Sequence, residues 1–409
     1  MRNCRLKYLF FVKQPKHLAQ ILESLNTFMK KWTTFACMAG LYIHIPFCRS
    51  RCIYCGFYST TMLDMRQRYA DALCQEMRMR GGSAIGTIYL GGGTPSLLTG
   101  PMLRQLFDTI EDVYEVNDTA EITMECNPDD VSVDFAEMLR TLPINRVSMG
   151  LQSFEDKRLQ FLRRRHTSSQ GRQAVEILRQ AGIGNISIDL MFGFPGETLE
   201  DWEYDIDQAL RLEVEHISAY SLMYEEGTPL NEMLERHQVS AVDDDTYIIM
   251  YEKLVEKMKE AGYEHYEISN FARPGYQSRH NSSYWDETPY LGIGAAAHSY
   301  DLKSRSSNVS DLKQYIHSIE HGIMPSQREI LSMTDRYNDM ITTRLRTSRG
   351  ISLDAVRTSY GEDLVAYLLE NAAAHLANNW LKVENGHLRL TLSGIMMSDT
   401  VMSDLIKTD

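Results

Sequence analysis

Residues 41–58 read Leu-Tyr-Ile-His-Ile-Pro-Phe-Cys-Arg-Ser-Arg-Cys-Ile-Tyr-Cys-Gly-Phe-Tyr, so an apolar β-type run leads directly into Cys48, Cys52 and Cys55. Positions i, i+4 and i+7 share one face of a helix, and packing of three small buried side chains is therefore one interpretation. Pro46 and Gly56 enclose the cysteines, and two arginines, a serine and a tyrosine lie among them, which favours a loop. We expect a strand followed by a cysteine-bearing loop.

Three thiols this close together suit a metal site in a reducing compartment better than a disulfide framework, because the chain has only seven cysteines. A structural zinc site needs four ligands, and neither Cys74 nor Cys126 belongs to a second Cys-x-x-Cys pair. Three thiolates fit better with a four-iron cluster in which one iron has no protein ligand. The cluster is the preferred interpretation, with zinc and simple packing as the alternatives.

Residues 38–270 alternate β-type and helix-type segments at intervals of about 30 residues. Strands are expected at 41–45, 87–90, 121–125, 146–149, 186–191 and 216–222, with amphipathic helices between them, for example at 62–80 and 170–181. This alternation predicts parallel βαβ units with right-handed crossovers. The expected fold class is α/β, a partial (β/α)6 TIM-type barrel with its chemistry at the carboxyl ends of the strands.

A different pattern begins near residue 326. Helices are expected at 333–347, 352–360 and 364–379, followed by short β-type runs at 381–384 and 387–392. Asn385-Gly386 between these two runs is a strong hairpin signal. The pattern predicts a smaller, mainly helical, winged-helix-like C-terminal domain over 326–409, joined to the barrel by a connector over 271–325.

Charge argues against nucleic acid as a partner. The chain has a net charge of −13, and residues 326–409 carry −2, so a winged-helix-like end would repel DNA. Residues 1–37 differ, because their net charge is +6, which leaves −19 for the other 372 residues. We expect this basic extension to be a disordered tail or to precede a natural start at Met38. It lacks a signal-peptide pattern, and we expect a cytoplasmic protein.

The spacing Cys-x3-Cys-x2-Cys directly after a first barrel strand resembles the radical S-adenosylmethionine (SAM) superfamily. The resemblance implies that Cys48, Cys52 and Cys55 hold a [4Fe-4S] cluster whose open iron binds the amino and carboxylate groups of SAM. It implies that the cluster donates an electron, SAM splits and a 5′-deoxyadenosyl radical forms in a site that excludes water.

Polar residues at the ends of the predicted strands fit that resemblance. The glycine run 91–93 lacks the lysine of a P-loop, so we expect the backbone to approach a ligand there. Glu125, Gln152 and Asp189 then follow at intervals of one βα repeat. Such residues face one mouth of a barrel, where carboxylates and an amide can hold the ribose hydroxyls and the amine of SAM.

Five motifs together resemble the group formed by the oxygen-independent coproporphyrinogen dehydrogenases (HemN) and the haem chaperones (HemW). They are Tyr42-x-His-Ile-Pro-Phe-Cys, Gly91-Gly-Gly-Thr-Pro-Ser, Glu125-Cys-Asn-Pro, Gly150-Leu-Gln-Ser-Phe and Asp189-Leu-Met-Phe-Gly-Phe-Pro-Gly. The resemblance covers about residues 40–400. It implies that SAM is contacted by Tyr42, Tyr54, Gly92, Gly93, Thr94, Glu125, Gln152, Arg164 and Asp189. No catalytic residue is assigned.

Two features distinguish the members of this group. The dehydrogenases have a fourth cysteine two positions after the third, where this chain has Phe57. His280-Asn-Ser-Ser-Tyr284-Trp285 matches the His-Asn-x-x-Tyr-Trp motif of the haem chaperones. A turn whose Tyr and Trp pack into the core is the alternative reading. An imidazole is nevertheless a good axial haem ligand, and the two aromatic rings offer a flat apolar surface for the macrocycle.

We therefore expect a haem chaperone that binds haem as cargo through His280, Tyr284 and Trp285 and delivers it to haem-accepting respiratory proteins. The resemblance also implies an electron donor for the cluster, a homodimer, and peripheral contact with a membrane during transfer. A coproporphyrinogen dehydrogenase is the enzymatic alternative, and a zinc-stabilised barrel is the third hypothesis.

Overall fold

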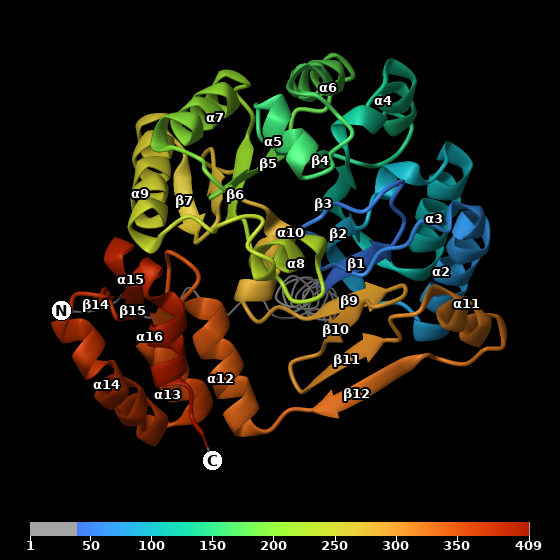
Figure 1. Ribbon diagram of the computed structural model, residues 1–409. Helices are drawn as coiled ribbons and strands as arrows, with labels where there is room; N and C mark the ends of the chain where they lie inside the picture. The colour runs from blue at the N-terminus through green and yellow to red at the C-terminus, as the bar shows by residue number, and fades with distance from the viewer. Residues whose placement is uncertain (1–38, 409) are drawn as a thin grey trace, which may run out of the picture. The chain divides into compact units, whose positions relative to one another are not determined.

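Six parallel strands form the centre of the fold in the computed structural model, which describes residues 39–408 (Figure 1). They are β1 (Ala39–Ile45), β2 (Ala84–Gly92), β3 (Glu115–Cys126), β4 (Arg146–Gln152), β5 (Ile186–Phe192) and β6 (His216–Ser221), and each pairs with the next in parallel. The predicted partial (β/α)6 barrel is confirmed. The predicted basic extension over 1–37 lies outside the described residues.

Helices cross from one strand to the next, as the amphipathic segments predict. They are α2 (Arg66–Arg80), α3 (Gly100–Val113), α4 (Val133–Leu139), α5 (Asp156–Phe161), α6 (Ser168–Gln180) and α7 (Leu199–Arg211). Thr167 and Thr198 start α6 and α7 with capping boxes. In each, the threonine hydroxyl accepts the backbone N–H of the third helical residue, and the side chain of that residue accepts the threonine N–H. These caps fix the residue at which each βα loop ends and its helix begins.

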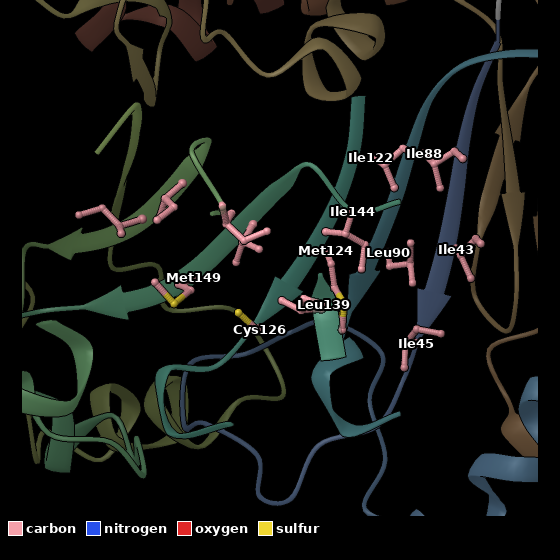
Figure 2. Packing of buried hydrophobic residues seen from close by; sticks show 14 of the residues in the cluster. Ile43, Ile45, Ile88, Leu90, Ile122, Met124, Cys126, Leu139, Ile144 and Met149 are labelled. Atoms are coloured by element: carbon pink, nitrogen blue, oxygen red, sulfur yellow. The ribbon is translucent and has the colours of Figure 1, made fainter. Parts of the chain in front are cut away.

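Alternate residues of the strands point to opposite faces of the sheet and so separate the core from the barrel interior. Figure 2 shows the buried side chains of Ile43, Ile45, Ile88, Leu90, Ile122 and Met124 packing together on one face with Leu139 of α4. Cys126 belongs to this apolar core. The intervening positions of the same strands carry Tyr42, Tyr89 and Glu125, which places polar groups inside the barrel.

The sheet continues beyond both edges of the barrel. Next to β1 lie β9 (Tyr290–Ile293), β10 (His298–Tyr300), β11 (Ser304–Asn308) and β12 (Ser326–Ile330), and beyond β6 lie β8 (Asn270–Ala272) and β7 (Glu264–Glu267), which completes a 12-stranded sheet. The sequence did not indicate these strands, because they have three to five residues and those of β12 are all exposed. The segment predicted as a connector that carries the haem motif, 271–325, contains β9, β10 and β11 together with α11 (Leu312–Glu320).

Three further helices follow β6 and precede the C-terminal segment: α8 (Pro229–Glu235), α9 (Asp244–Glu260) and α10 (Arg279–Trp285). Helix α10 carries the His-Asn-x-x-Tyr-Trp motif. Ser278 caps it, and the Glu121 carboxylate accepts the backbone N–H groups of Arg279 and His280, both at 3.0 Å. Since Glu121 lies in β3, the start of α10 is fixed to the barrel itself.

The C-terminal segment has a hydrophobic core of its own, which includes Tyr337, Ile341, Leu368, Leu388 and Val401. It consists of α12 (Met333–Arg344), α13 (Leu353–Tyr360), α14 (Glu362–Ala377), α15 (Leu392–Met396) and α16 (Ser398–Leu405), with a small sheet of β13 (Ile351–Ser352), β14 (Leu381–Glu384) and β15 (His387–Leu390). Asn385 and Gly386 both have positive φ, as the predicted hairpin turn requires. None of the described helices is long and apolar enough to cross a membrane.

Candidate functional site

A cavity of about 670 Å³ lies at the carboxyl ends of the barrel strands. All three predicted cluster cysteines and all nine predicted SAM contacts line it: Tyr42, Cys48, Cys52, Tyr54, Cys55, Gly92, Gly93, Thr94, Glu125, Gln152, Arg164 and Asp189. The fold therefore brings the residues chosen by the strand-end argument together around one cavity. The predicted haem residues His280, Tyr284 and Trp285 do not line this cavity.

Backbone hydrogen bonds and a buried side chain hold the cysteine loop in place. The Cys48 N–H donates to the Thr60 carbonyl at 2.9 Å, and the Leu230 N–H donates to the Ile53 carbonyl at 3.0 Å. Ile53 is 2% exposed and belongs to a small separate core that also includes Leu162 and Leu230. Packing of Ile53 in this small core therefore anchors the loop. The three thiols are half-buried and border the cavity.

The donor set fits an iron–sulfur cluster. Burial raises the pKa of the Cys48 and Cys55 thiols, so anionic sulfur there requires positive charge nearby. Among residues 39–408, no three His, Cys, Asp or Glu side chains are close enough to share a single metal ion. A [4Fe-4S] cluster binds each thiolate through a different iron, so it needs thiols that border one cavity rather than meet at one point.

Arg164 supplies positive charge directly beneath the cysteine loop. Its Nη1 donates to the Cys52 Sγ at 3.6 Å, and its Nη2 donates to the Asn127 side chain and the Gly150 carbonyl, both at 2.7 Å. The flanking Arg165 instead pairs with Asp129 at 2.6 Å. All three consecutive arginines line the cavity, and Arg164 is the one that donates to a cysteine sulfur.

Asn127 is a site residue that sequence reasoning missed. Its amide nitrogen donates to the Thr94 hydroxyl at 3.0 Å, and its amide oxygen accepts the Arg164 guanidinium. It therefore links Thr94 of the glycine-rich loop to Arg164, which in turn contacts Cys52. Its place directly after β3, inside the Glu-Cys-Asn-Pro motif, was the available signal.

The glycine run lines the cavity and also makes a close backbone contact that was not predicted. Gly92 has φ +111°, and a Cβ at Gly93 would lie 2.7 Å from the Phe47 carbonyl oxygen. The Gly93 N–H also donates to the Ile45 carbonyl at 2.8 Å. The backbone of the glycine run thus approaches the end of β1, where the cysteine loop begins. The glycines thus join the two loops of the site.

Two half-buried carboxyl groups, those of Glu125 and Asp189, face the cavity, and no basic side chain of residues 39–408 forms an ion pair with either. The Glu125 carboxylate accepts the Tyr89 hydroxyl at 2.7 Å and the Gly92 N–H at 3.0 Å. Burial raises the pKa of Glu125 to about 7 despite these bonds, and burial raises the pKa of Asp189 to about 6. A cationic ligand would favour the charged form of both groups, and SAM, with its positively charged sulfonium, is such a ligand.

This electrostatic arrangement predicts pH-dependent SAM binding. Because Glu125 is protonated below about pH 7 in the ligand-free cavity, lowering the pH from about 8 to 6 is expected to weaken SAM binding about tenfold. Glu125→Gln is expected to bind more weakly at pH 8 and to lose this part of the pH dependence. Equilibrium dialysis of SAM against anaerobically reconstituted protein measures both profiles, and parallel profiles would contradict the assignment.

The outer part of the cavity is aromatic and was not predicted. Tyr220, Met223, Tyr247 and Tyr251 line it, together with Phe57 at the rim. Phe57 is 72% exposed, so the position of the missing fourth cysteine carries a large apolar side chain in solvent. These residues leave space for a ligand beyond the predicted SAM contacts.

His280 lies inside the barrel, beneath the cavity. Its Nδ1 hydrogen-bonds with the Thr87 hydroxyl at 2.8 Å and its Nε2 with the Tyr284 hydroxyl at 2.9 Å. The ring stacks on Tyr89 with 5.0 Å between centroids, and burial lowers the pKa of His280 to about 3. The imidazole is therefore neutral, fully buried and hydrogen-bonded at both nitrogens. Trp285, at the other end of α10, borders a second cavity.

Comparison with known proteins agrees with this geometry. The chain matches the models of the Radical SAM superfamily over residues 42–209 and of the HemN C-terminal domain over residues 331–397. It resembles coproporphyrinogen III oxidase (HemN) from Escherichia coli in fold, with a TM-score of 0.79 and 20% identity over 91% of this chain and 90% of that chain.

Relatives with similar sequences show which family within the superfamily the chain belongs to. It is 36% identical to the heme chaperone HemW of Bacillus subtilis over 80% of this chain and 88% of the relative. It is 30% identical to HemW of Lactococcus lactis over 90% and 97%, and 32% identical to HemW of Mycobacterium tuberculosis over 90% and 94%. The predicted radical SAM resemblance is confirmed, and the chain belongs to the HemW family.

Proposed function

We propose that this protein is a haem chaperone, which binds haem and delivers it to haem-dependent respiratory proteins. The observation that carries the proposal is the similarity to proteins named heme chaperone along most of both chains. Phe57 at the position of the fourth dehydrogenase cysteine supports the same choice. The expected location is the cytoplasm, with peripheral membrane contact during transfer.

The barrel cavity is proposed to hold a [4Fe-4S] cluster on Cys48, Cys52 and Cys55. SAM would contact Tyr42, Tyr54, Gly92, Gly93, Thr94, Glu125, Gln152, Arg164 and Asp189. When bound and supplied with an electron by a donor, this pair provides reductive radical chemistry. The protein's own contributions are the Arg164 cation beside Cys52 and the carboxyl groups of Glu125 and Asp189.

The His-Asn-x-x-Tyr-Trp motif is proposed to contribute to haem binding. His280 is neutral, as an iron ligand must be, because burial lowers its pKa to about 3. Its Nε2 faces the Tyr284 hydroxyl, so ligation of haem iron by His280 requires α10 to move and this hydrogen bond to break. The proposal therefore includes a closed form, which keeps the ligand enclosed, and an open form, which exposes it.

His216 offers a matched control for His280. Both rings are fully buried, and His216 likewise bonds a hydroxyl at each nitrogen, Ser187 at 2.8 Å and Tyr266 at 2.7 Å. His280→Ala is expected to weaken haem binding roughly tenfold or more, while His216→Ala keeps the parent affinity. Both variants are expected to lose about 2–4 kcal/mol of stability. If the two variants bind haem with equal affinity, His280 has only a structural role.

The proposed function is tested on one anaerobically reconstituted sample. Titration with haem is expected to produce a saturable Soret band at about one haem per chain, and coproporphyrinogen III is expected to remain unchanged in the presence of SAM and a reductant. The fold shared with HemN favours the dehydrogenase as the second candidate. Conversion to protoporphyrinogen IX without a Soret change would establish that candidate and overturn the chaperone proposal.

A further inference from the structure

A second cavity, of about 510 Å³, lies where α10, α12 and α16 meet. Trp285 at the end of α10, Thr342 and Thr343 of α12, Arg346 just after it, and Met402 of α16 line its wall. Figure 1 shows α12 and α16 side by side next to the barrel. Thr342 and Ser403 are exposed, so this cavity, here called the Trp285 groove, opens to the surface.

Arg346 is a cation without a full counter-ion. Its Nε is buried and has no hydrogen-bond partner. Asp399 lines the same groove, but no carboxylate of residues 39–408 forms an ion pair with Arg346 within 4 Å. Its backbone is fixed, because the Ile268 N–H donates to the Arg346 carbonyl at 3.0 Å. Burial raises the pKa of the neighbouring Glu267, and Arg346 offsets only part of that effect. A half-buried cation in this state is stabilised by an anionic ligand.

Trp285 adds a flat aromatic surface to the same wall. The Arg346 guanidinium carbon lies 5.2 Å from the centroid of the Trp285 ring, in cation–π contact. The indole Nε1 is buried and has no hydrogen-bond partner. Two unpartnered N–H groups beside an aromatic ring and the apolar side chain of Met402 suit a flat, largely apolar ligand that carries carboxylates.

We propose that the Trp285 groove binds the carboxylate-bearing edge of a tetrapyrrole, with Arg346 pairing one carboxylate and Trp285 contacting the ring. This inference rests on the proposed haem-binding function and assigns a site to it. Arg346 also lines the barrel cavity, so a ligand here adjoins both that cavity and the helix that encloses His280. The His-Asn-x-x-Tyr-Trp motif would thus meet its ligand first through Trp285, at an open groove from which cargo can leave.

The carboxylate contact can be isolated by changing the ligand as well as the protein. Haem and haem dimethyl ester share the macrocycle and the iron, but the ester has no carboxylate charge. The parent protein is expected to bind haem about tenfold more tightly than the ester, as one charge-assisted hydrogen bond would give. Arg346→Gln is expected to bind both ligands equally, and Arg346→Lys is expected to keep part of the preference.

Arg349→Gln is the matched control, because it removes an exposed positive charge three residues away that does not line the groove. It is expected to retain the full preference for haem. If Arg346→Gln keeps the parent preference, the groove assignment is overturned while haem binding itself stands. If the parent protein shows no Soret change with either ligand, the proposed function fails instead. Circular dichroism of each variant confirms that losses do not come from unfolding.

Discussion

Replacing Cys48, Cys52 or Cys55 by serine is expected to abolish the iron–sulfur cluster. All three thiols border the barrel cavity. Among residues 39–408, Cys126 is the other cysteine that lines it, but Cys126 is 5% exposed and packs in the apolar core, so it is not expected to replace a lost ligand. Each variant is expected to fall from about four irons and four sulfides per chain to nearly none after anaerobic reconstitution. Iron and labile-sulfide analysis, together with the broad cluster absorption, measures this loss.

Cys74→Ser is the control for that experiment. Cys74 is 1% exposed and belongs to the apolar core, and its Sγ contacts the Gln105 carbonyl at 3.7 Å rather than the cavity. Its cluster content is expected to match the parent. A Cys52→Ser variant that kept the full iron content would refute the cluster assignment, and one zinc per chain without sulfide would favour the zinc-stabilised barrel.

Gly93→Ala is expected to disable the site through the backbone. The new Cβ would lie 2.7 Å from the Phe47 carbonyl oxygen and 3.0 Å from the Ile45 carbonyl oxygen. These atoms are backbone and cannot rotate away, so the end of β1 must shift, at a cost of about 1–3 kcal/mol. Because the cysteine loop begins there, SAM affinity is expected to fall tenfold or more and cluster yield to decrease.

Gly184→Ala serves as the comparison for Gly93→Ala. Gly184 is exposed, and a Cβ there meets nothing within 4 Å. It should therefore be neutral or slightly stabilising, through loss of unfolded-state freedom. Thermal unfolding and SAM dialysis on the two variants separate the local clash from a general effect of alanine. Normal SAM binding by Gly93→Ala would show that the two loops are not coupled in this way.

The barrel was predictable because its strands are buried on the face that packs against helices. Runs such as Ile43 to Ile45 and Ile88 to Leu90 alternate with polar positions that point into the barrel, and the repeat length placed Glu125 and Asp189 at one mouth. The flanking strands could not be predicted in this way. β10 has three residues and β12 is wholly exposed, so tertiary pairing alone defines them.

The motif on α10 shows where residue chemistry alone is insufficient. A histidine followed by Tyr284 and Trp285 predicts a ligand-binding surface, yet the helix places its two ends in different environments. His280 points into the barrel against Tyr89, while Trp285 faces the groove beside Arg346. Glu121 fixes the N-terminus of α10 and so sets which end faces the barrel. Because Glu121 and His280 are about 160 residues apart, no local sequence pattern reveals this contact.

Haem transfer to an acceptor tests the central claim most directly. Haem-loaded protein is mixed with the apo form of a small b-type cytochrome, and both Soret bands are followed after rapid separation. The account predicts that the cytochrome gains haem as the loaded protein loses it, faster than from serum albumin at the same haem concentration. Haem that remains on the protein, or that leaves no faster than from albumin, would contradict the claim that this protein delivers haem.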